Sequence, residues 1–425
     1  MKLKSLSYGA AVLSVVALSF GALAPAYAEE ASPAAPAADE SAVVEQDGSR
    51  EPDANACSKY VLHPQLIASD TQPDGSPIEP QSTKNATPVV FVHGWVSYIK
   101  HDDEHDGFFS KYVDRTANGH AGILLADSDV KSSLIGVAQQ VPGAQVYAFD
   151  YSQVDSHWVT DPYIGPKLAK GIECLAEAYG NKVVLVGHSM GGLAIREAMS
   201  HETSAGTPVS ELVSQVFTVA TPNTGSVYAD ISGTAIENAT TSKIGALRLP
   251  AKFVWDALGI CNSLYQANVK CTPIPALNVF RGEGGQALRT GSQELRDLAP
   301  MPENVNYTAV SGNVQLGGFS LFGKTSDPIV SVGDLMVVDQ KSATFAADKQ
   351  VNNVCRYGVV SKWSAKEKIQ RVEAIGHPGS ERPASIVTTP CRHDALLRET
   401  NTANALVEVI NQAVIENGSL VTDGE

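Results

Sequence analysis

The residues Gly187-His188-Ser189-Met190-Gly191 have the types and spacing of a site for nucleophilic catalysis. They follow the apolar run 183–186 and precede an amphipathic run, so we expect a strand, a sharp turn and a helix. The two outer glycines lack a Cβ, which lets the chain bend closely at both ends of the turn. This arrangement exposes the hydroxyl of Ser189 on a strained turn, as a nucleophile requires. The alternative interpretation is a glycine-rich turn with an incidental serine.

A serine hydroxyl needs a base to remove its proton, and turns of this type are followed along the chain by an acid and then a histidine. The histidines after Ser189 are His201, His377 and His393. His201 falls in the helix that leaves the turn, too close in sequence to fold back over the serine. His393 follows the β-prone run 384–389 and opens the last amphipathic helix. This position favours His393 as the base, with His377 as the alternative.

The acid is expected just after a strand, and residues 306–312 have the pattern of that strand. Asp327 precedes Pro328, which biases the aspartate to an extended conformation on a rigid turn. We therefore favour Asp327 as the acid and keep Asp334 as the alternative. Each of them can also be an ordinary turn aspartate.

A second apolar run, residues 88–92, predicts a buried strand that ends in His93-Gly94. The loop after it can direct the main-chain amide of Trp95 towards the site, beside the amide of Met190. Two such donors stabilise the oxyanion of a tetrahedral intermediate, and loss of one typically costs about 10²–10³ in rate. The alternative role of Trp95 is packing within the loop.

These motifs, taken in order, give the chain a resemblance to secreted bacterial lipases and esterases of the α/β-hydrolase family. The segments that carry it are 90–95, 187–192, the Thr-Pro-x-x-Gly-Ser segment 218–226, and 292–300, where the cap of such lipases returns to the sheet. The ordered set spans roughly residues 86–415 and is more specific than the Gly-x-Ser-x-Gly motif alone. The resemblance implies a serine carboxylester hydrolase that cleaves acyl esters, with lipids as the expected substrates and no cofactor.

Short apolar runs alternate with amphipathic ones along the middle of the chain. Strands are expected at 145–149, 183–186 and 213–219, and helices at 166–179 and 193–201. This order predicts an α/β-hydrolase fold, with a mostly parallel, doubly wound sheet. The alternation stops between residues 223 and 300, where we expect a helical cap or lid. Its aromatic residues either line an acyl pocket or pack the cap onto the core.

The N-terminus has the pattern of a secretory signal peptide. Lys2 and Lys4 precede an apolar region, and Ala26-Tyr27-Ala28 is a small-residue cleavage site, so we expect residues 1–28 to be removed near Ala28. A membrane anchor is the alternative, but the apolar run is short and is broken by glycines and serines. Residues 29–56 predict a disordered Ala/Pro/acidic spacer, and residues 57–425 one catalytic domain. The expected location is extracellular or in the cell envelope.

Six cysteines in the exported part of the chain predict disulfides, with fifteen ways to pair them. They are Cys57, Cys174, Cys261, Cys271, Cys355 and Cys391. Cys261–Cys271 closes the shortest loop and is the first choice. Cys355–Cys391 would then hold the segment before His393, and Cys57–Cys174 would tie the N-terminal arm to a helix. The spacings do not match a zinc site.

The chain is acidic, with a formal net charge of −15 over 425 residues. Residues 1–28 carry only Lys2 and Lys4, so their removal changes this charge from −15 to −17. A surface of this sign repels nucleic acid and anionic membranes, and both are disfavoured as partners. No later segment is apolar for long enough to span a bilayer. The acidic run 102–106 is typical of a solvated loop, so no metal site is predicted.

Two other functions fit the same motifs. One is a cell-envelope acyltransferase, in which the acyl group passes from the serine to a sugar hydroxyl instead of water. The other is a catalytically inactive binding module on the hydrolase scaffold, against which the complete set of Ser, His and Asp candidates argues.

Overall fold

The computed structural model describes residues 54–61, 86–95, 97, 134–227, 229–230, 282–317, 328–331, 333–334, 336–337, 340–364, 369–375 and 391–418. In this part of the chain, one eight-stranded sheet has the order β2-β1-β3-β4-β5-β7-β8, and β6 pairs with β5. Its strands are β1 (Thr87–Val92), β2 (Ala144–Phe149), β3 (Val183–His188), β4 (Val213–Val219), β5 (Asn306–Gly317), β6 (Pro328–Ser331), β7 (Lys349–Ser364) and β8 (Ile369–Ile375). Along this spatial order, each neighbouring pair of strands from β2 through β1, β3, β4 and β5 to β7 is parallel. Strand β6 pairs antiparallel with β5, and β8 pairs antiparallel with β7. The predicted mostly parallel α/β sheet is confirmed.

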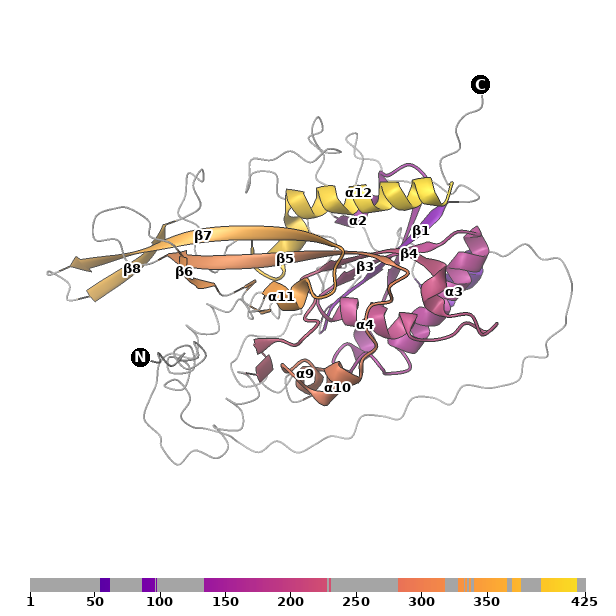
Figure 1. Ribbon diagram of the computed structural model, residues 1–425, viewed down its shortest axis with the longest axis horizontal. Helices are drawn as coiled ribbons and strands as arrows, with labels where there is room; N and C mark the ends of the chain where they lie inside the picture. Colours follow the sequence, from indigo (N-terminus) through magenta and orange to yellow (C-terminus); the bar gives the residue numbers. More distant parts are fainter. Residues whose placement is uncertain are drawn as a thin grey trace, which may run out of the picture.

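Helices cover both faces of this sheet (Figure 1). One face carries α3 (Gly165–Tyr179) and α4 (Met190–Met199), and the other carries α2 (Leu134–Gln139) and α12 (Thr400–Glu416). Shorter helices lie in the connections, namely α9 (Glu283–Ala287), α10 (Gln293–Asp297), α11 (Gln340–Ala343), η1 (Ala54–Lys59), η4 (Ser152–Val154), η5 (Val209–Leu212) and η7 (Ala395–Arg398). Both faces are covered, so the central strands read as continuous apolar runs.

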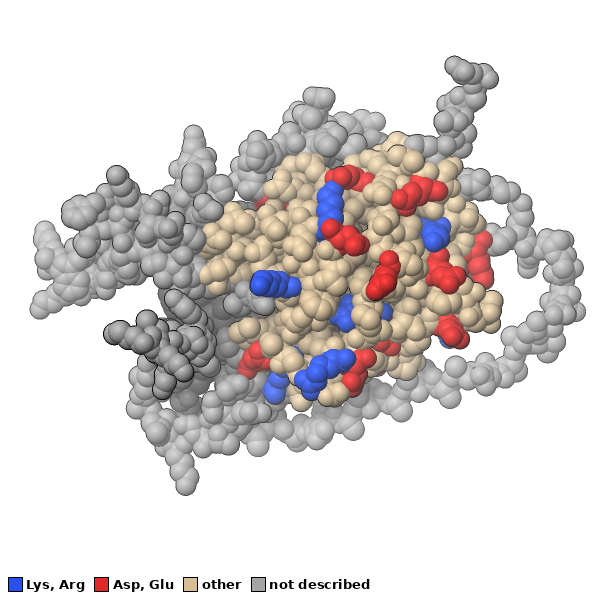
Figure 2. All heavy atoms as spheres, in the orientation of Figure 1, with Lys and Arg blue, Asp and Glu red and all other residues tan. Residues whose placement is uncertain are grey.

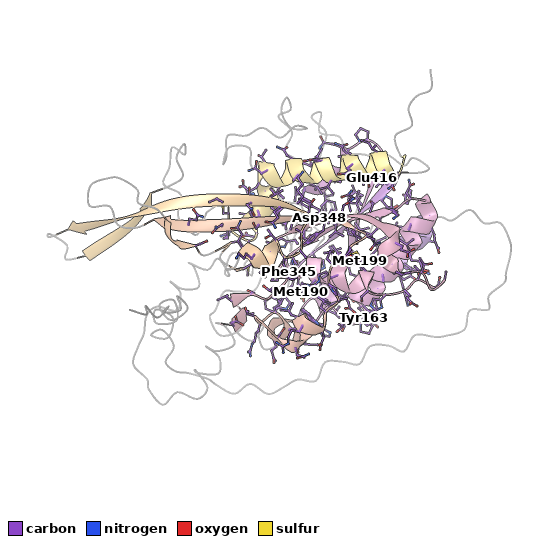
Figure 3. All side chains as sticks on the ribbon, viewed as in Figure 1. Tyr163, Met190, Met199, Phe345, Asp348 and Glu416 are labelled. Carbon is purple, nitrogen blue, oxygen red and sulfur yellow. A yellow bond between two sulfur atoms is a disulfide. The ribbon has the colours of Figure 1, made fainter. Side chains whose placement is uncertain are left out.

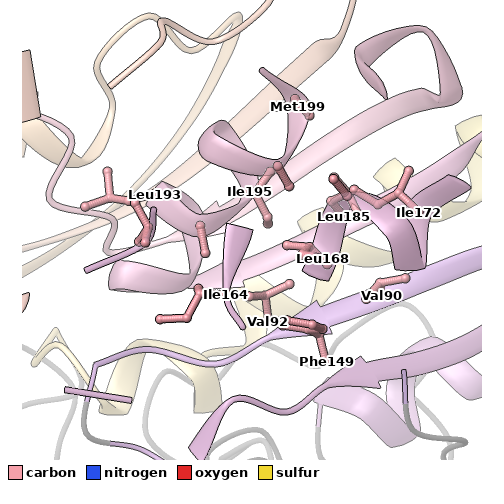
Figure 4. Packing of buried hydrophobic residues seen from close by; sticks show 14 of the residues in the cluster. Val90, Val92, Phe149, Ile164, Leu168, Ile172, Leu185, Leu193, Ile195 and Met199 are labelled. Atoms are coloured by element: carbon pink, nitrogen blue, oxygen red, sulfur yellow. The ribbon is translucent and has the colours of Figure 1, made fainter. Parts of the chain in front are cut away.

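The core therefore has two halves separated by the sheet. In β1, Val90 and Val92 pack towards α3 and α4, while Val89 and Phe91 pack towards α2 and α12. Figure 4 shows the first half, where Leu168 and Ile172 of α3 meet Leu185 of β3. Each such fully buried aliphatic side chain contributes roughly 1.5–3 kcal/mol relative to an exposed one.

Helix α3 shows why the sequence forms these elements locally. Pro166 stands in its first turn, where a missing N–H costs nothing, and Gly180 ends it with a φ of 65°. Leu168, Ile172 and Leu175 recur at helical spacing and are buried on one face. The predicted helix 166–179 is confirmed to within one residue.

The sheet extends beyond the helical layers on the side of β6 and β8 (Figure 1). Strand β5 continues to Gly317, past the predicted end at residue 312, because β7 pairs with it over this whole length. The hairpin of β7 and β8 continues the sheet further. The β-prone run 384–389 lies outside the described residues.

A disulfide between Cys57 and Cys174 ties η1 to α3. A second disulfide joins Cys355 of β7 to Cys391. Both pairings agree with those expected from the sequence, while Cys261 and Cys271 lie outside the described residues. So do residues 1–53 and most of the predicted cap, of which the structure describes residues 223–227, 229–230 and 282–300.

On the face drawn in Figure 2, acidic side chains are interspersed with basic ones. Among the described helices, none is long and apolar enough to cross a membrane.

Candidate active site

Ser189 lies at the sharp turn between β3 and α4. Its backbone has φ 53° and ψ −127°, a strained conformation for a residue with a Cβ. The turn is held by a hydrogen bond from the Ser189 N–H to the carbonyl oxygen of Val219 (2.9 Å), and by one from the Gly192 N–H to the carbonyl oxygen of Ser189 (3.1 Å). Ser189 is partly exposed, whereas its neighbours His188 and Met190 are buried. The predicted strand, strained turn and helix are present.

Glycines give this turn the space it needs. A Cβ on Gly187 would lie 2.8 Å from the main-chain nitrogen of Gly192, and a Cβ on Gly191 would overlap the carbonyl oxygens of Val92 and His93. The start of α4 is therefore pressed against the end of β1. The helix begins at Met190, three residues before the predicted start at residue 193.

The loop after β1 passes directly beside Ser189. A Cβ on Gly94 would lie 2.9 Å from the Cβ of Ser189 and 3.1 Å from the carbonyl oxygen of His188. Trp95 follows on this loop, and Met190 is the first residue of α4 (Figure 3). The first amides of a helix have no acceptor within the helix, so the Met190 N–H is suited to an external oxygen. The two amides predicted to form an oxyanion hole thus belong to segments that meet at Ser189.

His93 holds this loop in place through its ring and its main chain. Its ring is buried and stacked on Tyr151, with ring centroids 3.9 Å apart. The Tyr151 N–H donates to Nε2 of His93 (3.0 Å), so the ring hydrogen resides on Nδ1, which faces the carbonyl oxygen of Gly94 (2.9 Å). The Tyr151 hydroxyl donates to the His93 carbonyl oxygen at 2.7 Å. Burial raises the pKa of Tyr151 well above its usual value, which keeps the phenol a neutral donor.

Asp155 lies near this histidine, and its pKa is shifted by its surroundings. Burial raises the pKa of Asp155 to about 6, the positive charge of a protonated His93 would lower it, and the carboxylate of Asp150 raises it further. Its protonation state therefore changes in the mildly acidic range.

The histidine favoured as base, His393, is buried and bound to an aspartate. Its Nδ1 lies 2.9 Å from Oδ2 of Asp334, and its main-chain N–H donates to the carbonyl oxygen of Asp334 at 3.0 Å. The ring of His188, the residue before Ser189, lies 4.8 Å from the His393 ring, and its Nε2 is 3.2 Å from the His393 carbonyl oxygen. The structure thus brings His393 next to the turn that carries Ser189.

The carboxylate of Asp334 is 1% exposed and is fully engaged through hydrogen bonds. While Oδ2 faces His393, Oδ1 accepts the main-chain N–H groups of Met336 (2.9 Å) and Val337 (2.6 Å). An aspartate that accepts from the backbone just ahead of it forms a tight local turn, which fixes the direction of its side chain.

Asp327, the acid favoured by the sequence, lies outside the described residues, as does His377. Pro328, which follows Asp327 in the sequence, pairs with Gly317. Asp334, in contrast, lies beside Gly312, where an added Cβ would be 3.0 Å from the Asp334 Cβ. Gly312 and Gly317 are five positions apart on β5, which corresponds to about 16 Å at about 3.3 Å per residue. Pro328 therefore lies at one point along β5, and the Asp334–His393 pair lies at another point.

Gly312 is a residue of the site that the sequence did not reveal. A Cβ there would also overlap the carbonyl oxygen of Cys391, so the glycine lets β5, the acid loop and the histidine loop approach one another. The disulfide from Cys355 to Cys391 anchors the same loop two residues before His393. Within the described residues, no group of three His, Cys, Asp or Glu side chains is placed to hold a metal ion.

The parallel sheet, the strained serine between β3 and α4, and the buried histidine–aspartate pair define an enzyme of the α/β-hydrolase class, similar to lipases and esterases. Residues 148–244, which contain the serine turn and β4, match the family model described as lecithin:cholesterol acyltransferase. The resemblance predicted from the motifs is thereby confirmed. No curated protein matches the chain significantly.

Three of the solved structures that match this chain are lipases. A lipase from Bacillus licheniformis in its mature form is 18% identical, with 65% of this chain and 86% of that chain covered and a TM-score of 0.36. The Staphylococcus hyicus lipase is 15% identical, with 65% and 88% covered and a TM-score of 0.35. Aspergillus fumigatus lipase B is 14% identical, with 84% and 68% covered and a TM-score of 0.33.

Proposed function

We propose that the protein is an exported serine carboxylester hydrolase that cleaves acyl esters, with lipid esters as its substrate class. The observation that carries the proposal is the buried Asp334–His393 pair, whose histidine contacts the residue before a strained, partly exposed Ser189. A serine, a histidine and an acid in this order form the machinery of acyl transfer through a covalent intermediate.

In the proposed reaction, Oγ of Ser189 attacks the ester carbonyl carbon while Nε2 of His393 takes the hydroxyl proton. Asp334 holds Nδ1 of the imidazole and stabilises the imidazolium that forms. The N–H groups of Trp95 and Met190 donate to the oxyanion of the tetrahedral intermediate. When this intermediate collapses, the alcohol leaves with the proton from His393 and the acyl group stays on Ser189. Water, activated by the same histidine, then releases the acid and restores the serine.

The acid in this proposal is Asp334, the alternative considered from the sequence, and not Asp327. The reason is physical: a neutral imidazole has one N–H, and the Nδ1 of His393 is already directed at Oδ2 of Asp334. Export is proposed from the N-terminal pattern of residues 1–28. Recovery of the protein from the medium with Glu29 as its first residue would support export, and an uncleaved N-terminus would contradict it.

The test of the mechanism is replacement of Ser189 by Ala. Hydrolysis of p-nitrophenyl esters should fall by at least about 10³-fold, because members of such a triad act as a unit. Labelling by a fluorophosphonate probe should also be lost. Ser204→Ala is the matched control, since Ser204 is an exposed serine bound to Glu173, and it should retain full activity. Retention of a tenth of the activity by Ser189→Ala would exclude the serine mechanism.

The substrate class is tested separately. A series of p-nitrophenyl esters from acetate to palmitate, together with triolein, distinguishes a lipase from an esterase of short acyl chains. Preference for the long chains and turnover of triolein are expected. Activity on acetate alone would leave the serine mechanism intact but would refute lipid esters as the substrate class.

Acyl transfer to an alcohol is the second candidate function, favoured by the match of residues 148–244 to the acyltransferase family model. The acyl-enzyme would be the same, and the acceptor hydroxyl would replace water in the second step. The products formed in the presence of a sugar, whose hydroxyl group is the acceptor, distinguish the two functions. An acyltransferase yields mostly the new ester, whereas the hydrolase yields mostly the free acid.

A further inference from the structure

The peptide group between Met336 and Val337 is hydrogen-bonded at both ends. Its N–H, on Val337, donates to Oδ1 of Asp334 at 2.6 Å. Its carbonyl oxygen, on Met336, accepts the hydroxyl hydrogen of Ser226 at 2.6 Å. A continuous series of hydrogen bonds therefore leads from Ser226 through this peptide to Asp334 and on to His393.

Ser226 is held firmly at its own main chain. Its N–H donates to the carbonyl oxygen of Leu288 at 2.8 Å, and its carbonyl oxygen accepts the Asp230 N–H at 3.2 Å. The Asp230 side chain in turn accepts the Thr290 N–H at 2.9 Å. The side chain of Ser226 is 8% exposed. Ser226 thus stands where the two ends of the 223–300 segment meet, and it reaches from there to the loop that carries Asp334.

The ends of that acid loop are anchored independently of Ser226. The amide of Asn313 on β5 accepts the Ser331 hydroxyl and donates to the side-chain oxygen of Gln340 (3.1 Å). Gln340 also donates to the Ser311 hydroxyl at 3.0 Å. Loss of the Ser226 hydroxyl therefore leaves the loop in place and changes only the peptide that contacts the carboxylate.

We propose that Ser226 is a positioning residue for the triad acid, which acts by orienting and polarising the Met336–Val337 peptide that donates to Asp334. This inference rests on the proposed function. The hydrogen bond at the carbonyl increases the polarity of the peptide, and hydrogen bonds in such series strengthen one another in a low-dielectric interior. A small displacement of the carboxylate turns the imidazole of His393, and errors of about 1 Å in catalytic geometry can cost about 10²-fold in rate.

The test compares Ser226→Ala with Ser342→Ala. Ser342 is a buried serine that contacts the same 221–226 segment, accepting the Thr224 N–H at 3.0 Å and donating to the carbonyl oxygen of Gly225 at 3.3 Å. The Ser342 hydroxyl bonds to Thr224 and Gly225 instead of to the Met336–Val337 peptide, so it reports on the stability of the segment alone. Each variant is measured for kcat and KM on one p-nitrophenyl ester and for thermal unfolding.

Ser226→Ala should lower kcat roughly tenfold with KM changed less than about twofold, while Ser342→Ala keeps kcat within about twofold. The downfield proton resonance of His393 Nδ1 should shift in Ser226→Ala and stay in place in Ser342→Ala. Equal kcat values for the two variants, or an unshifted resonance, overturn the inference. If Ser226→Ala does not fold, Ser226→Cys keeps the shape with a weak donor, and an unchanged kcat in that variant overturns the inference equally.

Fluorophosphonate labelling separates this result from the mechanism itself. Wild-type protein that labels at Ser189, combined with equal variants, refutes only the role of Ser226. Wild-type protein that does not label refutes the proposed function.

Discussion

Asp334 and His393 are joined twice, through the imidazole Nδ1 to Oδ2 of the carboxylate at 2.9 Å and through the main-chain N–H of the histidine to the carbonyl oxygen of the aspartate at 3.0 Å. The second bond keeps the histidine backbone beside the aspartate even when the side-chain bond is altered. Substitution of the carboxylate therefore tests its chemistry with little change in the position of His393.

Asp334→Asn should lower kcat by about 10³–10⁴-fold, because the amide can hold the imidazole in the wrong tautomer and cannot stabilise the imidazolium. Asp327→Asn should stay within about twofold of the wild-type kcat. Ester hydrolysis by the two purified variants provides the measurement. If Asp327→Asn is the inactive variant, the acid is Asp327 and the pairing of Asp334 with His393 is structural.

Gly312 should be as sensitive to substitution as a residue of the triad loops. Gly312→Ala places a methyl group against the carbonyl oxygen of Cys391 and within 3.0 Å of the Asp334 Cβ, so it displaces both loops. We expect a loss of at least roughly tenfold in kcat, with a destabilisation of about 1–3 kcal/mol. Gly171→Ala is the control, because its methyl group meets only Val61 and Tyr60 at the η1 side of α3. Steady-state kinetics with full activity in Gly312→Ala would contradict the close approach.

Removal of one described disulfide should mainly lower stability, whereas removal of the other should mainly lower the catalytic rate. Cys57–Cys174 joins residues 117 apart and Cys355–Cys391 residues 36 apart, which correspond to about 5 and about 4 kcal/mol in the chain-entropy model. Removing the first pair by double Cys→Ala substitution should lower Tm more. Removing the second should lower kcat more, since Cys391 holds the loop two residues before His393. An unchanged kcat without Cys355–Cys391 would show that the loop is held by its other contacts.

Stability should depend on pH through Asp155. Burial raises the pKa of Asp155 from 3.8 to about 6, so the folded state retains the proton between these values while the unfolded state has lost it. Stability therefore falls as the pH rises from about 4 to about 6. Asp155→Asn removes this fall and should be more stable than wild type at pH 7.5 by about 1–2 kcal/mol, after allowance for solvent screening of a partly exposed group.

Denaturant unfolding at pH 4 and pH 7.5 checks this prediction. Asp297→Asn, at an exposed aspartate on α10, is the control and should change stability little at either pH. An Asp155→Asn variant that is no more stable than wild type at pH 7.5 would show that the carboxylate is better solvated than its burial indicates.

Local sequence patterns determined the central part of the fold and the turn that carries Ser189. The run 213–219 predicts β4 at its observed bounds, and the motif around Ser189 predicts the turn between β3 and α4. These features depend on periodicity and on glycines within a few residues of one another, so they can be read from a short window. The choice of His393 over His377 also came from its place before the last helix, and in the structure His393 contacts Asp334.

Only the tertiary structure decided which aspartate meets that histidine. Asp327 and Asp334 are seven residues apart and both follow the same strand, so spacing favours neither, and the rigid Asp-Pro step pointed to the first. The antiparallel pairing of β6 with the far end of β5 carries Pro328 along the sheet extension, while Gly312 admits Asp334 and Cys391 to the same point. The contact from Ser226 to Met336 likewise joins residues 110 apart. Such contacts depend on strand register and on how closely two backbones can approach, which are properties of the packed sheet and not of any local segment.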